Sequence, residues 1–179
     1  MRVWTRLPIS WALALSFMAP AWATTLEQLT LSEMAQKSTA IVRARVTGSR
    51  SAYKGANIYT YFQLQVVENW KGQSIQEFAI PGGVVGGIRQ AAAGAPDVKP
   101  GQEYVLFLWT SHSGLTQVMG LSQGLFRLSG EGSGEAVAQR SAASELMLNR
   151  SGVPVNDRAV RMPVQDLRAR VLQALGAAK

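Results

Sequence analysis

The sequence offers few side chains for acid–base or nucleophilic chemistry. It contains one histidine, His112, and no cysteine, which excludes cysteine nucleophiles, thiolate zinc sites and disulfide scaffolds. His112 stands between Ser111 and Ser113, but adjacent residues in a turn rarely orient a hydroxyl for attack. The acidic residues are scattered, and no pair has a spacing typical of a hydrolase. We therefore expect no catalytic residue, no metal site and no cofactor.

A glycine-rich stretch from Gly82 to Pro96 is the first candidate binding site. Its backbone amides could surround an anion beside Arg89, but it matches neither the Walker pattern nor the dinucleotide-binding pattern. The stretch is long and almost uncharged, which is typical of functional loops. We predict that this stretch is the surface that binds a partner and that the charge of Arg89 orients the partner. The other predicted binding residues are Gly82, Gly83, Gly86 and Gly87.

The competing interpretation of this stretch is structural. Val84, Val85 and Ile88 would then fold back and fill one end of a barrel, and the glycines would serve only to turn the backbone. The sequence leaves both interpretations open.

A second candidate site is basic. Arg43 and Arg45 share one face of a predicted strand, and Tyr59 and Tyr61 share a face of the next, a combination found in stacking platforms for nucleic acids. The formal charge of +7, from 18 basic and 11 acidic residues, also suits acidic polysaccharides or anionic lipids. The plain alternative is a solvated strand face.

Residues 1–23 have the pattern of a signal peptide. Arg2 and Arg6 precede an apolar run from Leu7 to Ala19, and Ala21-Trp22-Ala23 has the small-x-small form of a cleavage site. We expect a mature chain that begins at Thr24, is periplasmic or secreted, and has no integral membrane segment. Because an exported protein meets little nucleic acid, we do not expect nucleic acid as a partner.

Period-two alternation and turn residues predict a β-rich domain over residues 24–128. Thr30 and Glu33 form a capping box for a short helix, and Gly48–Asn57 is predicted to be a loop. Val66-Val67 interrupts the alternation and predicts a bulge. The predicted strands are Ala40–Thr47, Ile58–Trp70, Ile75–Ile80, Glu103–Trp109, Leu115–Gly120 and Gly124–Leu128. We expect Phe62, Leu64, Val66, Val105 and Phe107 to be buried on adjacent strands.

The composition changes over residues 129–179. Ser129 to Gly134 is predicted to be flexible, and Glu145–Leu148 to be a short strand. Pro163 begins an amphipathic helix that Gly176 ends. We expect its apolar stripe to pack on the barrel; the alternative is a helix that binds a partner or a membrane surface.

These elements predict a mainly β fold, a small five- to six-stranded OB-like barrel with a short N-terminal helix and a C-terminal amphipathic helix. The pattern resembles the netrin/TIMP-like group of OB-type barrels, and a family of uncharacterised bacterial secreted proteins with a Pro-Gly-Gly-x-x-Gly-Gly loop. The resemblance covers about residues 26 to 128. It is carried by Ser38–Val46, Ile58–Val67, Trp70-Lys71-Gly72, Pro81–Gly87 and Gly101–Phe107.

The resemblance implies a barrel used for binding. Animal metalloproteinase inhibitors of this group chelate the protease zinc through an N-terminal cysteine, whereas this chain would begin at Thr24 and has no cysteine, so that mechanism does not carry over. We expect an exported, non-enzymatic binding module that recognises another secreted protein through the barrel and its glycine-rich loop. The alternatives are a hydrolase or other enzyme with a site assembled from scattered residues, and a polyanion-binding barrel.

Overall fold

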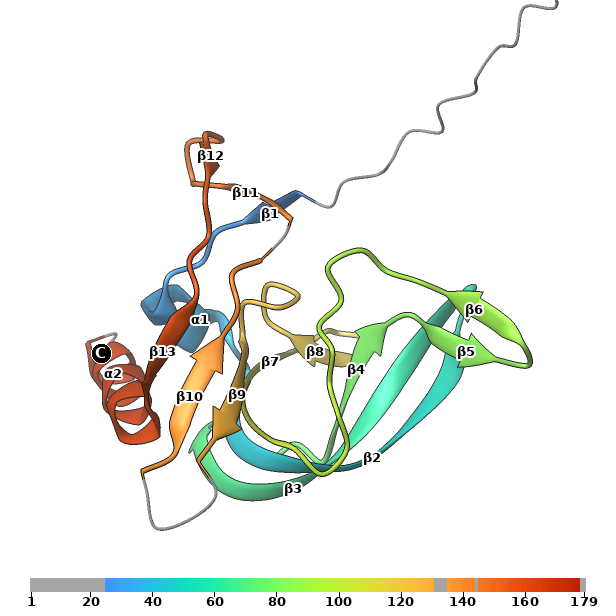
Figure 1. Cartoon of the computed structure of the whole chain (residues 1–179), viewed down its shortest axis with the longest axis horizontal. Helices are drawn as coiled ribbons and strands as arrows, with labels where there is room; N and C mark the ends of the chain where they lie inside the picture. The colour runs from blue at the N-terminus through green and yellow to red at the C-terminus, as the bar shows by residue number, and fades with distance from the viewer. Residues whose placement is uncertain (1–24, 131–134, 144, 178–179) are drawn as a thin grey trace, which may run out of the picture.

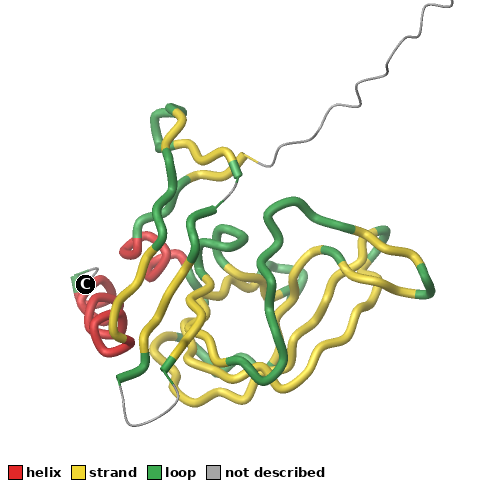
Figure 2. Tube along the Cα trace, viewed as in Figure 1, coloured by secondary structure: helices red, strands yellow, loops and turns green. Residues whose placement is uncertain are grey.

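The structure is a computed structural model that describes residues 25–130, 135–143 and 145–177. The predicted leader and residues 131–134 of the predicted flexible segment lie outside these ranges. Strands dominate, with one helix near each end of the described chain (Figures 1 and 2). The elements are β1 (Thr25–Glu27), α1 (Leu31–Lys37), β2 (Ala40–Lys54), β3 (Asn57–Lys71), β4 (Glu77–Pro81), β5 (Gly83–Val85), β6 (Ile88–Gln90), β7 (Glu103–Thr110), β8 (Thr116–Val118), β9 (Leu125–Ser129), β10 (Val137–Arg140), β11 (Leu146–Leu148), β12 (Pro154–Val155), β13 (Val160–Pro163) and α2 (Val164–Gly176).

Five strands close into a small barrel. β2 pairs with β3, β3 with β4, β4 with β8, β8 with β7 and β7 again with β2. The closing contact between β4 and β8 is parallel and joins Ala79 to Gln117, whereas the other four pairings are antiparallel. The predicted fold class, a mainly β OB-like barrel with a helix at each end, is confirmed.

The same sheet continues past the barrel. β9, β10 and β13 add to β7 in that order, so β7 has neighbours both in the barrel and in this extension. Sequence reasoning missed β10 and β13. A separate small sheet joins β1 to β11 in parallel and β11 to β12.

The hairpin of β2 and β3 forms a long arm. Gly48–Asn57 was predicted to be a loop, but pairing runs unbroken from Gly48 opposite Gln63 to Lys54 opposite Asn57. The prediction was wrong because this part of β2 is polar and glycine-containing, which hides the alternation of a strand. The bulge predicted at Val66-Val67 is confirmed, since Arg43 faces Glu68 while the next residue, Ala44, faces Val66.

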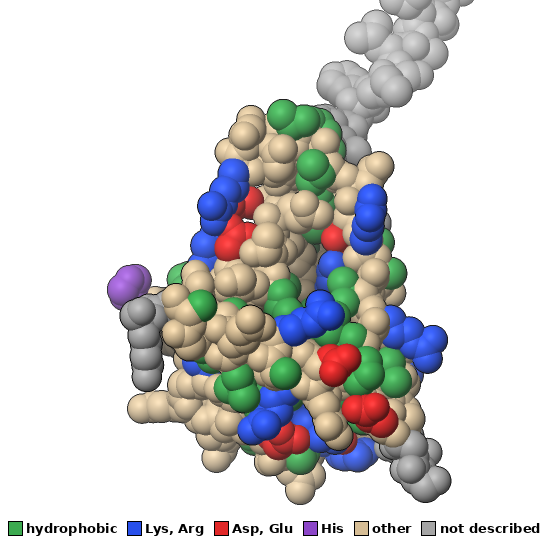
Figure 3. All heavy atoms as spheres, turned by 90° about the vertical axis from the view of Figure 1, so that its left-hand side faces the viewer, with side chains coloured by type: hydrophobic (Ala, Val, Ile, Leu, Met, Phe, Trp, Pro, Cys, Tyr) green, Lys and Arg blue, Asp and Glu red, His purple; other side chains and the backbone are tan. Residues whose placement is uncertain are grey.

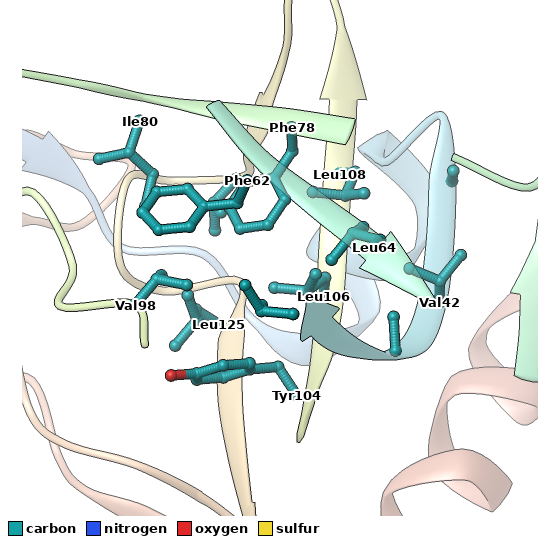
Figure 4. Packing of buried hydrophobic residues seen from close by; sticks show 14 residues of the cluster. Val42, Phe62, Leu64, Phe78, Ile80, Val98, Tyr104, Leu106, Leu108 and Leu125 are labelled. Carbon is teal, nitrogen blue, oxygen red and sulfur yellow. The ribbon is translucent and has the colours of Figure 1, made fainter. Parts of the chain in front are cut away.

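Two apolar clusters lie on opposite faces of the sheet. The barrel interior contains Phe62 and Phe78, whose rings are 5.4 Å apart between centroids (Figure 4). The second cluster contains Phe107 and Val105 and packs beneath α1 and α2. The five predicted core residues are split between the two cores, because those of β3 point into the barrel whereas Val105 and Phe107 of β7 point to its outer face. The two strands were predicted to be adjacent, which is wrong, since β2 lies between them. Of the five, only Val66 is partly exposed.

Both helices cover the outer face of the sheet. In α1 the capping box is confirmed, with the Glu33 N–H donating to Thr30 Oγ1 at 3.2 Å and the Thr30 N–H donating to Glu33 Oε2 at 2.7 Å. In α2 Val164, Leu167 and Val171 are buried, so the helix is docked, as predicted. No helix in the described residues is long and apolar enough to cross a membrane.

Candidate functional site: the hairpin of β5 and β6

The structure separates the two candidate sites predicted from the sequence. Gly82 to Arg89 lies at one end of the molecule, where β5 and β6 form a projecting hairpin (Figure 1). Arg43 and Arg45 lie instead beside the C-terminal helix, lining a groove of about 1380 Å³ with Arg168. The two sets cannot form one binding site.

The base of the hairpin is fixed to the β2–β3 arm by hydrogen bonds. The Gly82 N–H donates to the Ile58 carbonyl at 2.8 Å, and the Thr60 hydroxyl donates to the Gly82 carbonyl at 2.8 Å. On the other strand, the Ile58 N–H donates to Gln90 Oε1 at 2.6 Å. The hairpin therefore leaves the barrel in one defined direction.

Gly83 allows this close attachment. Its φ of +146° is one that side chains rarely adopt. A Cβ at this position would lie 2.5 Å from Ser51 Oγ and 2.6 Å from Thr60 Oγ1, two atoms that are 3.1 Å apart and hydrogen-bonded. The glycine is needed for packing here, which is one of the two roles that the sequence left open.

The hairpin tip, defined as Val84 to Arg89, is exposed. Gly86 and Gly87 have φ of +57° and +79°, which is what a two-residue type I′ turn requires. Val84 and Ile88 are 50% and 59% exposed. Val84 pairs with Arg89 and Val85 with Ile88, so Val84 and Ile88 point to opposite faces of the ribbon. Both of these side chains are exposed, whereas Val85 is half-buried.

The exposure of Val84 and Ile88 contradicts the interpretation in which they fill the end of the barrel. Val98 and Ala95, from the segment before β7, pack against the barrel core instead. The turn also differs from an anion-binding nest, in which right- and left-handed residues alternate, because both turn glycines have positive φ. The tip is thus an apolar projection with one cation, Arg89.

Arg43 and Arg45 belong to a network of ion pairs. Arg43 Nε lies 2.5 Å from Glu103 Oε1, and Arg43 Nη1 lies 2.8 Å from Glu68 Oε1. Arg45 Nη2 lies 3.4 Å from Glu103 Oε2, and Arg168 Nε lies 3.5 Å from Glu68 Oε2. Figure 3 shows the side of the molecule that carries α2, where acidic and basic side chains are interspersed.

This network stabilises the charged forms of Glu68 and Arg43. The hydrogen bond from Trp70 Nε1, at 3.0 Å, lowers the pKa of Glu68, and Arg43 lowers it further. Burial opposes the charge on Arg43, but the hydrogen bonds to Glu103 and Glu68 outweigh it and raise its pKa. Arg43 and Arg45 thus join β2 to β3 and β7, which favours a structural role over a binding role.

The predicted stacking platform is not formed. Tyr59 and Tyr61 lie opposite Ala52 and Arg50 on the far part of the arm, whereas Arg43 lies opposite Glu68. The guanidinium of Arg50 instead sits 4.5 Å from the centroid of the Tyr61 ring.

Sequence reasoning missed a row of side chains on the outer face of the barrel. Tyr61 pairs with Ala79, Ala79 with Gln117 and Gln117 with Trp109, so all four side chains project from the same face. Trp109 is 42% exposed. The sequence does place Trp109 at the end of a buried strand, which could have pointed to an exposed aromatic side chain. The strand register that aligns Trp109 with Tyr61 cannot be predicted from the sequence.

His112 lies exposed in the turn between β7 and β8. Ser111 Oγ and Ser113 Oγ are 3.0 Å apart and hydrogen-bonded, and within the described ranges no hydrogen bond or ion pair involves the His112 side chain. Across the same residues, no three His, Cys, Asp or Glu side chains come together as a metal site would require.

No family model matches the sequence, and no curated protein matches it. The similarity to netrin/TIMP-like barrels therefore rests on the sequence patterns alone and stays a prediction.

Proposed function

We propose that the protein is an exported, non-enzymatic binding module that recognises another secreted protein through the hairpin tip. The observation that carries this proposal is the exposure of Val84 and Ile88 on both faces of a hairpin whose base is fixed. An apolar side chain on a projecting hairpin gains free energy when a partner removes it from water.

The attachment of the hairpin favours tight recognition. Hydrogen bonds from Thr60 and to Gln90 hold the base before any partner arrives, so binding orders few additional residues. Arg89, the one cation of the tip, would orient an acidic group of the partner.

Two features of the sequence support the exported setting and the binding class. Residues 1–23 have the charge and apolar pattern of a signal peptide. The resemblance to netrin/TIMP-like barrels implies binding rather than catalysis.

Affinity capture from the periplasmic fraction, with the purified protein as bait, tests the proposal. Ile88→Asp should abolish capture of the partner, because a carboxylate at the tip would have to be buried unpaired. The matched control is Val153→Asp, which changes a valine that is 54% exposed at a distance from the tip. If both variants lose capture of the partner, or if neither does, the hairpin tip is not the surface that binds the partner.

A second candidate function is binding of an acidic polysaccharide along the aromatic row. The exposed ring of Trp109 and the Tyr61 ring beneath Arg50 are the groups that stack on sugars and attract carboxylates. The partner of Arg50 in this region is Glu77, 3.0 Å away, which an acidic polymer would displace.

Sedimentation with insoluble polygalacturonate distinguishes this candidate. Trp109→Ala should release the protein from the polymer if the row binds it, whereas Ile88→Asp should have no effect. If Trp109→Ala binds the polymer as well as the wild-type protein does, the aromatic row is not the site that binds it.

A further inference from the structure

Three long polar side chains stand in line on the sheet extension. Arg127 of β9 pairs with Gln139 of β10, and Gln139 pairs with Arg161 of β13. Directly opposite residues project from the same face, so the two arginines flank the amide, with their Cα atoms roughly 10 Å apart. The opposite face of these strands carries Phe126 and Ala138, which pack beneath α2.

This row lines a cleft of about 710 Å³. The segment from Gly94 to Asp97 forms another wall, and Tyr104 and Ser122 contribute to the lining. Tyr104 OH accepts a hydrogen bond from the Lys99 N–H at 3.0 Å, so its own proton is free to be donated to a ligand. The cleft lies on the barrel side of the sheet, away from the groove that contains Arg43.

The two exposed arginines of the row are not neutralised by the protein. Arg127 and Arg161 take part in no ion pair or hydrogen bond within the described part of the chain. The third arginine of the cleft, Arg140, is paired with Asp157 at 2.5 Å. Two acidic side chains also line the cleft: Asp97, which lies 3.2 Å from Lys99, and Glu145.

Two buried polar atoms at the cleft lack a partner. Ser122 Oγ and Arg140 Nε are inaccessible to water and make no hydrogen bond. Because neither atom reaches the surface of the cleft, neither contacts a ligand there, and the groups that can do so are the exposed side chains of Arg127 and Arg161.

We propose that this cleft binds a phosphate group, held by Arg127 and Arg161. Guanidinium groups donate to phosphate oxygens in a bidentate manner, and two of them on either side of Gln139 match a group with several acceptor oxygens. The site is independent of the hairpin tip.

Calorimetric titration of the purified protein with inorganic phosphate tests the proposal. Arg127→Gln and Arg161→Gln should each weaken binding about tenfold, because each removes a charge-assisted hydrogen bond. Arg170→Gln is the matched control: it removes the same charge from the exposed face of α2 and should leave binding unchanged. Thermal unfolding of the variants verifies that each is folded, and Arg161→Lys, which keeps the charge, should bind phosphate better than Arg161→Gln.

Vesicles identify the source of the phosphate group. Binding to phosphatidylglycerol vesicles but not to phosphatidylcholine vesicles, lost in Arg127→Gln, would assign the group to a lipid headgroup. Phosphate binding without vesicle binding would assign it to a soluble ligand. The proposal is overturned if the wild-type protein does not bind phosphate, or if both glutamine variants bind it as tightly as the Arg170→Gln control.

Discussion

At the scale of single residues, the ion pair of Arg140 and Asp157 is the most deeply buried among the described residues. The two side chains are 10% and 5% exposed, and two guanidinium nitrogens lie 2.5 and 3.0 Å from the two carboxylate oxygens. Burial disfavours the charge of Asp157, but hydrogen bonds from Arg140 and from the Ala143 N–H outweigh it and lower the pKa. The pair fixes the end of β10 to the segment before β13.

Asp157→Asn should reduce the free energy of unfolding by about 3 kcal/mol at neutral pH, because it leaves a buried guanidinium without its counter-charge. The folded pKa of Asp157 lies below its unfolded value of about 3.9, so the pair contributes fully above that pH and its contribution disappears as the pH falls through the folded pKa. Urea unfolding at neutral and acidic pH should therefore show a difference between wild type and variant that shrinks in acid.

The control for this prediction is Asp97→Asn. That carboxylate is 79% exposed and lies 3.2 Å from Lys99, so its loss should cost less than about 1 kcal/mol. A cost for Asp157→Asn that is as small as the control's, or that does not change with pH, would contradict the structural role of the pair.

At the scale of elements, the hairpin of β5 and β6 depends on its glycines in different ways. Gly83 combines a φ of +146° with close contacts to two hydroxyls, whereas Gly86 has a φ of +57° and open space around it. Substituting alanine at Gly86 therefore tests the free-energy cost of the backbone conformation alone, whereas substituting it at Gly83 adds the cost of steric crowding.

Gly83→Ala should destabilise the protein by about 2 to 3 kcal/mol, because it adds both backbone strain and a clash with Ser51 and Thr60. Gly86→Ala, the matched variant, should cost only about 1 kcal/mol for the left-handed conformation. Urea unfolding of the two variants measures both costs. Equal costs would mean that the hairpin base is not packed against the arm.

The strand β7 contributes residues to both cores. Phe107 is fully buried, and its ring centroid is 5.7 Å from that of Phe126. Phe107→Ala should cost about 3 to 5 kcal/mol because of the cavity it leaves. Trp109→Ala, on the same face of the same strand but exposed, should cost less than about 1.5 kcal/mol. Similar losses of unfolding free energy for both variants would contradict the strand orientation.

The elements that the sequence predicted correctly are those with a buried face. Apolar alternation located β3, the continuous apolar run from Tyr104 to Leu108 located β7, and the Val66-Val67 doublet located a bulge. The arm beyond Thr47 was missed because strands that leave a core no longer need apolar residues. The hairpin of β5 and β6 lies in a stretch that was predicted to be a loop, because three-residue strands that contain or adjoin glycine carry little periodic signal.

The candidate sites were predictable only in part. Composition pointed to the glycine-rich stretch as a candidate site but left open whether it is exposed, and its fixed base depends on hydrogen bonds to Ile58 and Thr60, more than twenty residues away. Arg43 and Arg45 were selected for their charge, and their partners Glu68 and Glu103 are set by strand register and by the bulge. The phosphate cleft was missed because its residues come from three strands, two of which were not predicted.

At the scale of the whole molecule, the barrel separates two surfaces with different chemistry. The hairpin of β5 and β6 lies at one end of the molecule, and strands β9, β10 and β13 lie at the other (Figure 1). The hairpin tip has apolar side chains on both faces, and the cleft beside the other strands is lined by Arg127 and Arg161. A closed barrel with two cores holds both surfaces in a fixed relation. A binding module that engages a protein at one end and an anion at the other is consistent with this arrangement.

Site-specific photo-crosslinking in intact cells tests the role of the hairpin tip most directly. A photoreactive amino acid at Ile88 should yield one discrete crosslinked product with an exported protein, because this side chain is 59% exposed at the tip. The same amino acid at Val153, which is 54% exposed elsewhere, should not yield that product. Identical products from the two positions, or no product from position 88, would contradict the proposal that the tip binds a partner.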